Sequence, residues 1–155
     1  MELQIIPWNV DPEIFRIGNF AVRWYGLLFA SGFVFGYYIM KKIFKNEGLS
    51  DATLDRLTVY VAIGTIVGAR LGHCFFYEPS YYLARPLEIL KVWHGGLASH
   101  GAIIGNLIAL WLFSRKEKNP IIWSIDRVVI VVALAGALIR LGNLMNSEIY
   151  GVETT

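Results

Sequence analysis

The sequence predicts an all-α protein: a multi-pass transmembrane helical bundle with four spans in this chain. Two observations lead to this prediction. The chain is 55% hydrophobic and only 17% charged, with a mean hydropathy of +0.50, whereas a soluble domain of similar length carries more charge. Its apolar residues also come in blocks close to the ~20 residues that cross a bilayer as a helix. Each block is expected to be helical, because lipid leaves the backbone of an open strand unsatisfied.

We expect four spans within a single transmembrane domain, residues 1–155. The spans are residues 24–44, 57–77, 97–114 and 121–142, and the third is the shortest. Residues 11–20, before the first span, mix apolar and polar side chains, and we expect them to lie in the membrane interface.

Lysines and arginines predict the orientation of the spans. The first and third connections between spans are rich in them, at Lys41, Lys42, Lys45, Arg56, Arg115, Lys116 and Lys118. The second connection has only Arg85 and Lys91, offset by Glu78 and Glu88. By the positive-inside rule, the first and third connections are cytoplasmic. The N-terminus, residues 78–96 and the end of the fourth span are therefore expected on the outer side.

Glycines recur four residues apart within the predicted spans. They are Gly32 and Gly36 in the first span, Gly64, Gly68 and Gly72 in the second, and Gly101 and Gly105 in the third. Small residues at this spacing let helices approach closely. We therefore expect these glycines to pack helices together rather than to bind a ligand.

Polar residues gather in the outer half of the predicted spans. Arg70 lies about 10 Å below the outer end of the second span, and Tyr25 begins the first. The motif H-G-G-L-A-S-H-G precedes the third, and Arg140, Asn143, Asn146, Ser147 and Glu148 end the fourth. Two deep arginines suit an anionic head group such as a phosphate. The alternative is that both only snorkel to the interface.

The two histidines of that motif do not predict a metal site. His94 and His100 are six residues apart, which does not put two ligands on one helix face, and no carboxylate or thiol lies beside them. His100 can exchange protons near neutral pH, and the glycines indicate close approach of the backbone to a ligand. Cys74 is expected to be a packing residue. The net charge of +2 does not indicate a nucleic-acid partner.

Four motifs resemble the prolipoprotein diacylglyceryl transferase family. They are V-R-W-Y-G at 22–26, G-A-R-L-G at 68–72, H-G-G-L-A-S-H-G at 94–101 and R-L-G-N-L-M-N-S-E-I-Y-G at 140–151. They occur in the family's order. The last departs from the family's pattern at Ser147, where the family usually has glycine.

The resemblance implies a bacterial inner-membrane enzyme with its site on the periplasmic side. Such an enzyme moves the diacylglyceryl group of phosphatidylglycerol to the lipobox cysteine of a prolipoprotein signal peptide, and releases glycerol phosphate without a metal or cofactor. The implied catalytic residues are Tyr25, His100 and Arg140. The residues implied to bind phosphatidylglycerol are Arg70, Arg140, Asn143, Asn146, Glu148 and Gly151. Either His100 or Tyr25 is expected to remove the thiol proton, because the thiolate is the nucleophile.

The resemblance covers roughly the N-terminal half of the family pattern, and motifs of the C-terminal half do not occur in the 155 residues. We therefore expect these residues alone to be inactive or poorly active. Two alternatives remain open. One is a small transporter or channel subunit for an anionic solute, which would favour polar residues reaching the cytoplasmic side as well. The other is a non-catalytic membrane fragment that associates through its glycine faces.

Overall fold

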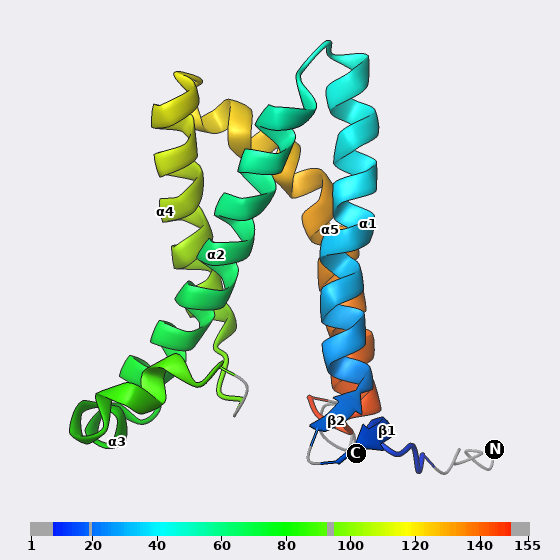
Figure 1. Cartoon of the computed structure of the whole chain (residues 1–155), viewed down its shortest axis with the longest axis vertical. Coiled ribbons are helices and arrows are strands. Elements are labelled where there is room, and N and C mark those ends of the chain that lie inside the picture. The colour runs from blue at the N-terminus through cyan, green and yellow to red at the C-terminus, as the bar shows by residue number, and fades with distance from the viewer. Residues whose placement is uncertain (1–7, 19, 93–94, 150–155) are drawn as a thin grey trace, which may run out of the picture. The chain divides into compact units, whose positions relative to one another are not determined.

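A computed structural model describes residues 8–18, 20–92 and 95–149 of the chain, and these residues are mostly helical. In chain order the elements are β1 (Glu13–Ile17), β2 (Phe20–Arg23), α1 (Trp24–Asn46), α2 (Asp51–Phe76), α3 (Pro79–Ala84), η1 (Pro86–Leu90), α4 (Ser99–Glu117) and α5 (Ile121–Met145) (Figure 1). The prediction of a helical protein is confirmed, and the two short strands are an addition to it.

Three of the four predicted spans are confirmed. Within the described residues, α1, α2 and α5 are the helices long and apolar enough to cross a membrane. The predicted third span is helical too, as α4, but it does not meet this criterion. The physical reason is its composition: its 19 residues include Asn106 in the middle and the charged residues 115–117 at the end. With three apolar helices, the chain is a multi-pass membrane protein.

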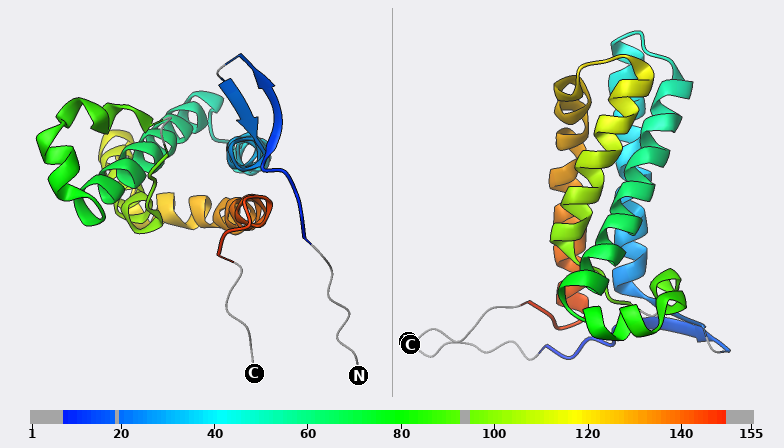
Figure 2. Two further views of the ribbon diagram at one scale, coloured as in Figure 1. Left: turned by 90° about the horizontal axis from the view of Figure 1, so that it is seen from below. Right: turned by 90° about the vertical axis from the view of Figure 1, so that its left-hand side faces the viewer.

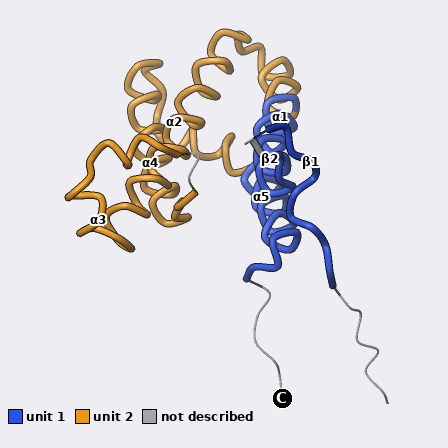
Figure 3. Tube along the Cα trace, turned by 60° about the horizontal axis from the view of Figure 1, so that its bottom comes forward, with its two compact units in different colours: residues 1–38, 130–155 blue, residues 39–129 orange. Residues whose placement is uncertain are grey.

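The chain divides into two compact units (Figure 3). Unit 1 is residues 1–38 and 130–155, and unit 2 is residues 39–129. The hairpin and most of α1 and α5 belong to unit 1, whereas α2, α3, η1 and α4 belong to unit 2. That the two units form one transmembrane domain stays a prediction.

In unit 1, a hairpin precedes the antiparallel pair of α1 and α5. Strand β1 pairs antiparallel with β2, with Phe15 opposite Val22, and Gly18 adopts a φ of +59° where the chain reverses. Such a left-handed conformation suits glycine because it has no Cβ. Residues 11–20 are expected from sequence to lie in the membrane interface, and these strands were not predicted.

The glycines of α1 make ordinary contacts with α5. A Cβ on Gly32 would lie 3.6 Å from Cα of Ala135, and one on Gly36 would lie 3.6 Å from Cβ of Val131. These distances are normal van der Waals separations. Large side chains elsewhere on these helices stay exposed, such as Val34 and Ile130, which suits a surface that faces lipid.

In unit 2, α2 and α4 run side by side and antiparallel with their backbones in contact (Figure 2). A Cβ on Gly64 would lie 2.7 Å from Cβ of Ala109, and one on Gly72 would lie 2.6 Å from Cα of Gly101. Real Cβ atoms do not approach this closely, so no side chain fits at these positions. The predicted packing role of the glycines in α2 and α4 is therefore confirmed.

Polar contacts and a small core reinforce the α2–α4 pair. Asn106 of α4 donates its Nδ2 hydrogen bond to Oγ1 of Thr65 in α2, at 2.9 Å. Near the end of α4, the Arg56 guanidinium pairs with the Glu117 carboxylate at 2.7 Å. Cys74 is fully buried in α2, which agrees with its predicted role as a packing residue.

Candidate functional site

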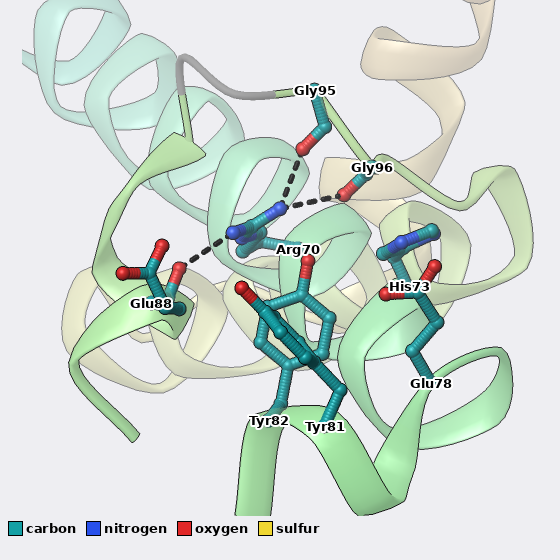
Figure 4. A pocket seen from close by; sticks show the side chains of 8 residues that line it. All are labelled: Arg70, His73, Glu78, Tyr81, Tyr82, Glu88, Gly95 and Gly96. Carbon is teal, nitrogen blue, oxygen red and sulfur yellow. Dashed lines mark hydrogen bonds between the residues drawn. The ribbon is translucent and has the colours of Figure 1, made fainter. Parts of the chain in front are cut away.

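Arg70 is buried in α2, with 3% of its surface exposed, and its guanidinium donates to main-chain carbonyls (Figure 4). Nε donates to the Ile89 oxygen at 2.9 Å and Nη2 to the Glu88 oxygen at 2.6 Å. Nη1 donates to the oxygens of Gly95 and, at 3.3 Å, Gly96. Arg70 thus joins α2 to two segments that lie 18 to 26 residues further along the chain.

A cavity of about 390 Å³ adjoins Arg70. The residues that line it are Arg70, His73, Glu78, Tyr81, Tyr82, Glu88, Gly95 and Gly96 (Figure 4). The Tyr82 ring is buried, and Cζ of Arg70 lies 5.0 Å from its centroid. The ring therefore stabilises the guanidinium through a cation–π interaction. His73 stacks on Tyr77, with centroids 5.4 Å apart.

The glycine pair of the H-G-G-L-A-S-H-G motif is required by the backbone. Gly95 and Gly96 both have positive φ, +84° and +72°, which side-chain-bearing residues rarely adopt. A Cβ on Gly96 would also lie 2.6 Å from Nε2 of His73 and 3.0 Å from Nη1 of Arg70. We interpreted these glycines from sequence as room for a ligand. In the structure, Gly96 makes room for His73 and Arg70.

His100 is the second residue of α4 and lies against aromatic rings. Its centroid is 4.9 Å from that of Phe76, edge-on, and 5.8 Å from that of Tyr77. Its Nε2 is buried and has no hydrogen-bond partner among the described residues. An imidazole nitrogen accepts a hydrogen bond when unprotonated and donates one when protonated, so Nε2 of His100 can exchange a proton with a ligand.

In unit 1, Tyr25 packs against Gly142 at the end of α5. A Cβ on Gly142 would lie 2.9 Å from Cδ2 of Tyr25 and 3.2 Å from its Cα. The missing side chain therefore lets the tyrosine approach the α5 backbone. Glu148 is close enough to interact electrostatically with Tyr25. The start of α1 and the residues that follow α5 thus contribute to one cluster.

The amides beside Glu148 belong to this cluster. Asn143 is buried, with 7% of its surface exposed. Asn146 donates from Nδ2 to Oε1 of Glu148 at 3.4 Å, and its own Oδ1 is buried without a partner in the described part of the chain. A buried carbonyl oxygen without a donor is costly. Asn146 can therefore accept a hydrogen bond from a ligand hydroxyl or N–H group.

Helix α5 ends in a Schellman motif with serine at the position that favours glycine. The Glu148 nitrogen donates to the Asn143 oxygen at 2.8 Å, and the Ser147 nitrogen donates to the Leu144 oxygen at 3.0 Å. Ser147 has a φ of +55°, a conformation that glycine adopts without strain. This motif directs the chain from Asn143 to Glu148. It also gives a physical reason for the glycine that the resembling family usually has here.

Arg140 lies on α5, one helical turn before Asn143 and Leu144, and its side chain is exposed. Its charge is thus available to a ligand, as the prediction of phosphate binding requires. The same exposure suits snorkelling to the interface, the alternative noted from sequence.

The structure brings the predicted site residues together in two groups. Unit 2 holds Arg70 and His100, and unit 1 holds Tyr25, Arg140, Asn143, Asn146 and Glu148. His94 and Gly151 lie outside the described residues. Convergence of the two groups in one site stays a prediction. Sequence reasoning missed Tyr82 and the four carbonyls that surround Arg70, and only the Gly-Gly pair signalled an unusual backbone there.

No group of three or more histidine, cysteine or acidic side chains suited to a metal ion occurs in residues 8–18, 20–92 and 95–149. The side chains of the two groups are of kinds that bind and orient polar organic groups: two cations, two amides, a carboxylate, a phenol and an imidazole. Arginine and amides bind phosphate and hydroxyl oxygens. The imidazole and the phenol can transfer protons.

Comparison with known proteins gives the chain a family. Residues 12–155 match the family model described as prolipoprotein diacylglyceryl transferase. Similar proteins named phosphatidylglycerol–prolipoprotein diacylglyceryl transferase include one from Tolumonas auensis, 55% identical, with 95% of this chain and 57% of the relative covered. The relative from Chloroherpeton thalassium is 49% identical over 95% of this chain and 55% of its own length. The relative from Porphyromonas gingivalis is 50% identical over 97% of this chain and 54% of its own length.

The chain spans about half the length of the curated relatives it matches. The family model nevertheless covers residues 12–155, which include both groups of candidate site residues and Gly151. The chain therefore belongs to the prolipoprotein diacylglyceryl transferase family.

Proposed function

We propose that this chain takes part in the transfer of a diacylglyceryl group from phosphatidylglycerol to the lipobox cysteine of a prolipoprotein. A thioether bond forms between the cysteine sulfur and the glyceryl carbon, the carbon–oxygen bond to the phosphate breaks, and glycerol phosphate leaves. The observation that carries this proposal is the family match over residues 12–155. The whole reaction is proposed for the protein that contains this chain.

The candidate residues suit the steps of this reaction. Arg140 offers an exposed cation to the phosphate, whose negative charge grows as the bond to carbon breaks. Asn143, Asn146 and Glu148 offer hydrogen-bonding groups to the head group. Asn146 supports this assignment in particular, because its buried Oδ1 has no partner within the described residues.

The cysteine thiol must lose its proton, because the thiolate is the effective nucleophile. His100 and Tyr25 are the two candidates for the base. An imidazole has a pKa near the working pH, whereas a phenol does so only after a large shift. The buried Nε2 of His100, which has no partner among the described residues, favours His100.

We further propose that α4 is a fourth span and that the candidate site faces the periplasm. Nineteen residues make a helix of about 28 Å, close to the hydrocarbon thickness. The glycine contacts along α2 support this assignment, because they hold α4 against a helix that is itself apolar enough to span. The distribution of lysine and arginine supports the orientation, and the bacterial inner membrane is the expected location.

The proposal is tested by incubating the full gene product with phosphatidylglycerol vesicles and a lipobox peptide. We expect the peptide to gain the mass of one diacylglyceryl group. His100→Ala should abolish this gain, while Tyr25→Phe tests the other candidate base. Arg115→Ala, at the opposite end of α4, is the control and should keep the wild-type rate. A wild-type protein that leaves the peptide unmodified would refute the proposed function. The same assay on the 155 residues alone tests the prediction that they are inactive or poorly active.

A further inference from the structure

We propose that Arg70 is a positioning residue that fixes the start of α4, and with it His100, by clamping the backbone before it. The inference rests on the proposed function for the role of His100. It assigns to Arg70 a task other than direct contact with a lipid phosphate, the role that the resemblance implies for it.

The hydrogen-bond donors of Arg70 are directed at main-chain oxygens. Its three nitrogen atoms make four hydrogen bonds, to the carbonyl oxygens of Glu88, Ile89, Gly95 and Gly96. A guanidinium has five N–H donors in a fixed plane. Most of its capacity is therefore committed to the protein itself, and the Tyr82 ring covers a face of the same group.

The four carbonyls lie outside α2 and α4, and Arg70 supplies donors to all of them. The oxygens of Gly95 and Gly96 belong to the irregular backbone before α4. Those of Glu88 and Ile89 belong to η1, where the Glu88 oxygen also accepts from the Lys91 nitrogen at 3.2 Å. A carbonyl that is withdrawn from water without a donor is costly. One planar group that reaches several oxygens at once is a solution that lysine, a point charge with a flexible stem, does not reproduce.

Backbone contacts connect the residues that Arg70 holds to His100. Past Gly96, the Ala98 nitrogen donates to the Ala69 oxygen at 2.9 Å, one residue before Arg70 in α2. Gly96 itself lies against His73, one turn after Arg70. Consecutive contacts thus hold residues 95–98 on one short stretch of α2. His100 follows two residues later, against Phe76 of the same helix.

Hydrogen exchange in the full gene product, reconstituted in lipid nanodiscs, tests the clamp without reference to activity. Arg70→Lys keeps the charge but not the planar fork. We expect it to speed amide exchange in residues 88–92 and 95–98 by at least about tenfold, the effect of losing a hydrogen bond to a charged group. Residues 102–114 of α4 should keep their protection, which shows that the variant is folded. Arg85→Lys is the matched control and should change nothing in these segments.

Gly96→Ala is a second variant that leaves Arg70 in place. A Cβ there would meet Nε2 of His73 and Nη1 of Arg70, and the residue would keep a strained φ. We expect the same local increase in exchange. If Arg70→Lys and Gly96→Ala both leave the exchange of residues 88–92 and 95–98 unchanged, the proposed positioning role of Arg70 is wrong.

Kinetics separate positioning from phosphate binding. If Arg70 positions the backbone, Arg70→Lys and Arg70→Gln should both lower kcat by at least about tenfold. Both should change the KM for phosphatidylglycerol by less than about twofold. If Arg70 instead contacts the lipid phosphate, Arg70→Lys should keep kcat and KM close to the wild-type values, and Arg70→Gln should raise KM. That result would overturn the inference. If the wild-type protein transfers no diacylglyceryl group, the proposed function fails, and the exchange experiment still decides whether Arg70 is a clamp.

Discussion

Gly68 of α2 and Gly105 of α4 pack backbone against backbone: a Cβ on Gly68 would lie 2.8 Å from Cα of Gly105. The two helices approach this closely because neither has a side chain at the contact. The pair lies between the contacts of Gly64 and Gly72 along the same helix face. The relative position of Arg70 and His100, on α2 and α4, depends on this packing.

Gly68→Ala is therefore expected to push α2 and α4 apart. We predict a loss of about 1–3 kcal/mol, the usual effect of overpacking a tight contact, measured by thermal unfolding in detergent. Gly36→Ala is the matched control, because its Cβ would meet Val131 at 3.6 Å, and it should be neutral or slightly stabilising. Equal effects of the two substitutions would contradict the assignment of the close contact to α2 and α4.

Ser147→Gly is expected to stabilise the end of α5. Ser147 has a φ of +55° in the Schellman motif, and a left-handed residue with a side chain costs about 1 kcal/mol or more compared with glycine. We predict a gain of about 1 kcal/mol, measured by thermal unfolding in detergent.

The reciprocal control for this prediction is Gly48→Ser at the end of α1. Gly48 occupies the same position in a matching motif, with a φ of +71° and a 2.8 Å bond from the Leu49 nitrogen to the Phe44 oxygen. The reciprocal substitution should lower stability by a similar amount. If Ser147→Gly lowers the stability and Gly48→Ser raises it, or if neither variant changes the stability, backbone strain at Ser147 is excluded.

Asn106 and Thr65 are expected to be coupled, because Nδ2 of Asn106 donates to Oγ1 of Thr65 at 2.9 Å between α4 and α2. We predict a coupling energy of about 0.6 kcal/mol, the average for such bonds in membrane proteins. A double-mutant cycle of Asn106→Leu and Thr65→Val, measured by unfolding in detergent, gives this quantity. Strictly additive effects would show that the hydrogen bond contributes nothing to the packing of the two helices.

The β-hairpin predicts a pH dependence outside the membrane spans. The Arg16 guanidinium hydrogen-bonds the Glu13 carboxylate at 2.7 Å and holds the pKa of Glu13 below its ordinary value. Because the pKa is lowered in the folded state, the contribution of this pair is present above the unfolded pKa. It is lost as the pH falls through the folded pKa.

Arg16→Gln should raise the pKa of Glu13 toward its ordinary value, and the carboxyl carbon shift in an NMR titration measures this change. The pair is exposed, so we expect a shift in the titration midpoint and little change in unfolding free energy. An unchanged midpoint would mean that Arg16 does not act on Glu13 in solution.

Much of the helical framework could be predicted from sequence, because apolar blocks and glycine spacing are local patterns. Helix α1 starts at Trp24 as predicted, but α2 starts at Asp51, before the predicted residue 57. The extra turns carry charged side chains and therefore fall outside the apolar block. Ser50 caps them by accepting from the Thr53 nitrogen, a signal that an apolar window does not detect.

The candidate site could be predicted only in part. The family motifs predicted which residues form the site, but not what Arg70 contacts. Its partners are main-chain carbonyls 18 to 26 residues away, and any residue type supplies a carbonyl. Their position depends on the left-handed backbone at Gly95 and Gly96 and not on a side-chain pattern. The strands β1 and β2 were missed for a related reason, because four or five residues of mixed polarity carry little signal.

We propose that Arg140 stabilises the departing phosphate while the diacylglyceryl group moves to a thiol. The most direct test of this claim measures glycerol phosphate released and peptide thioether formed in the same reaction of the full gene product. We predict equal amounts of both from the wild type, and a rate lower by about 10²–10³-fold in Arg140→Ala, the effect of removing one group that stabilises transition-state charge. Wild-type release and thioether formation by Arg140→Ala would contradict the claim.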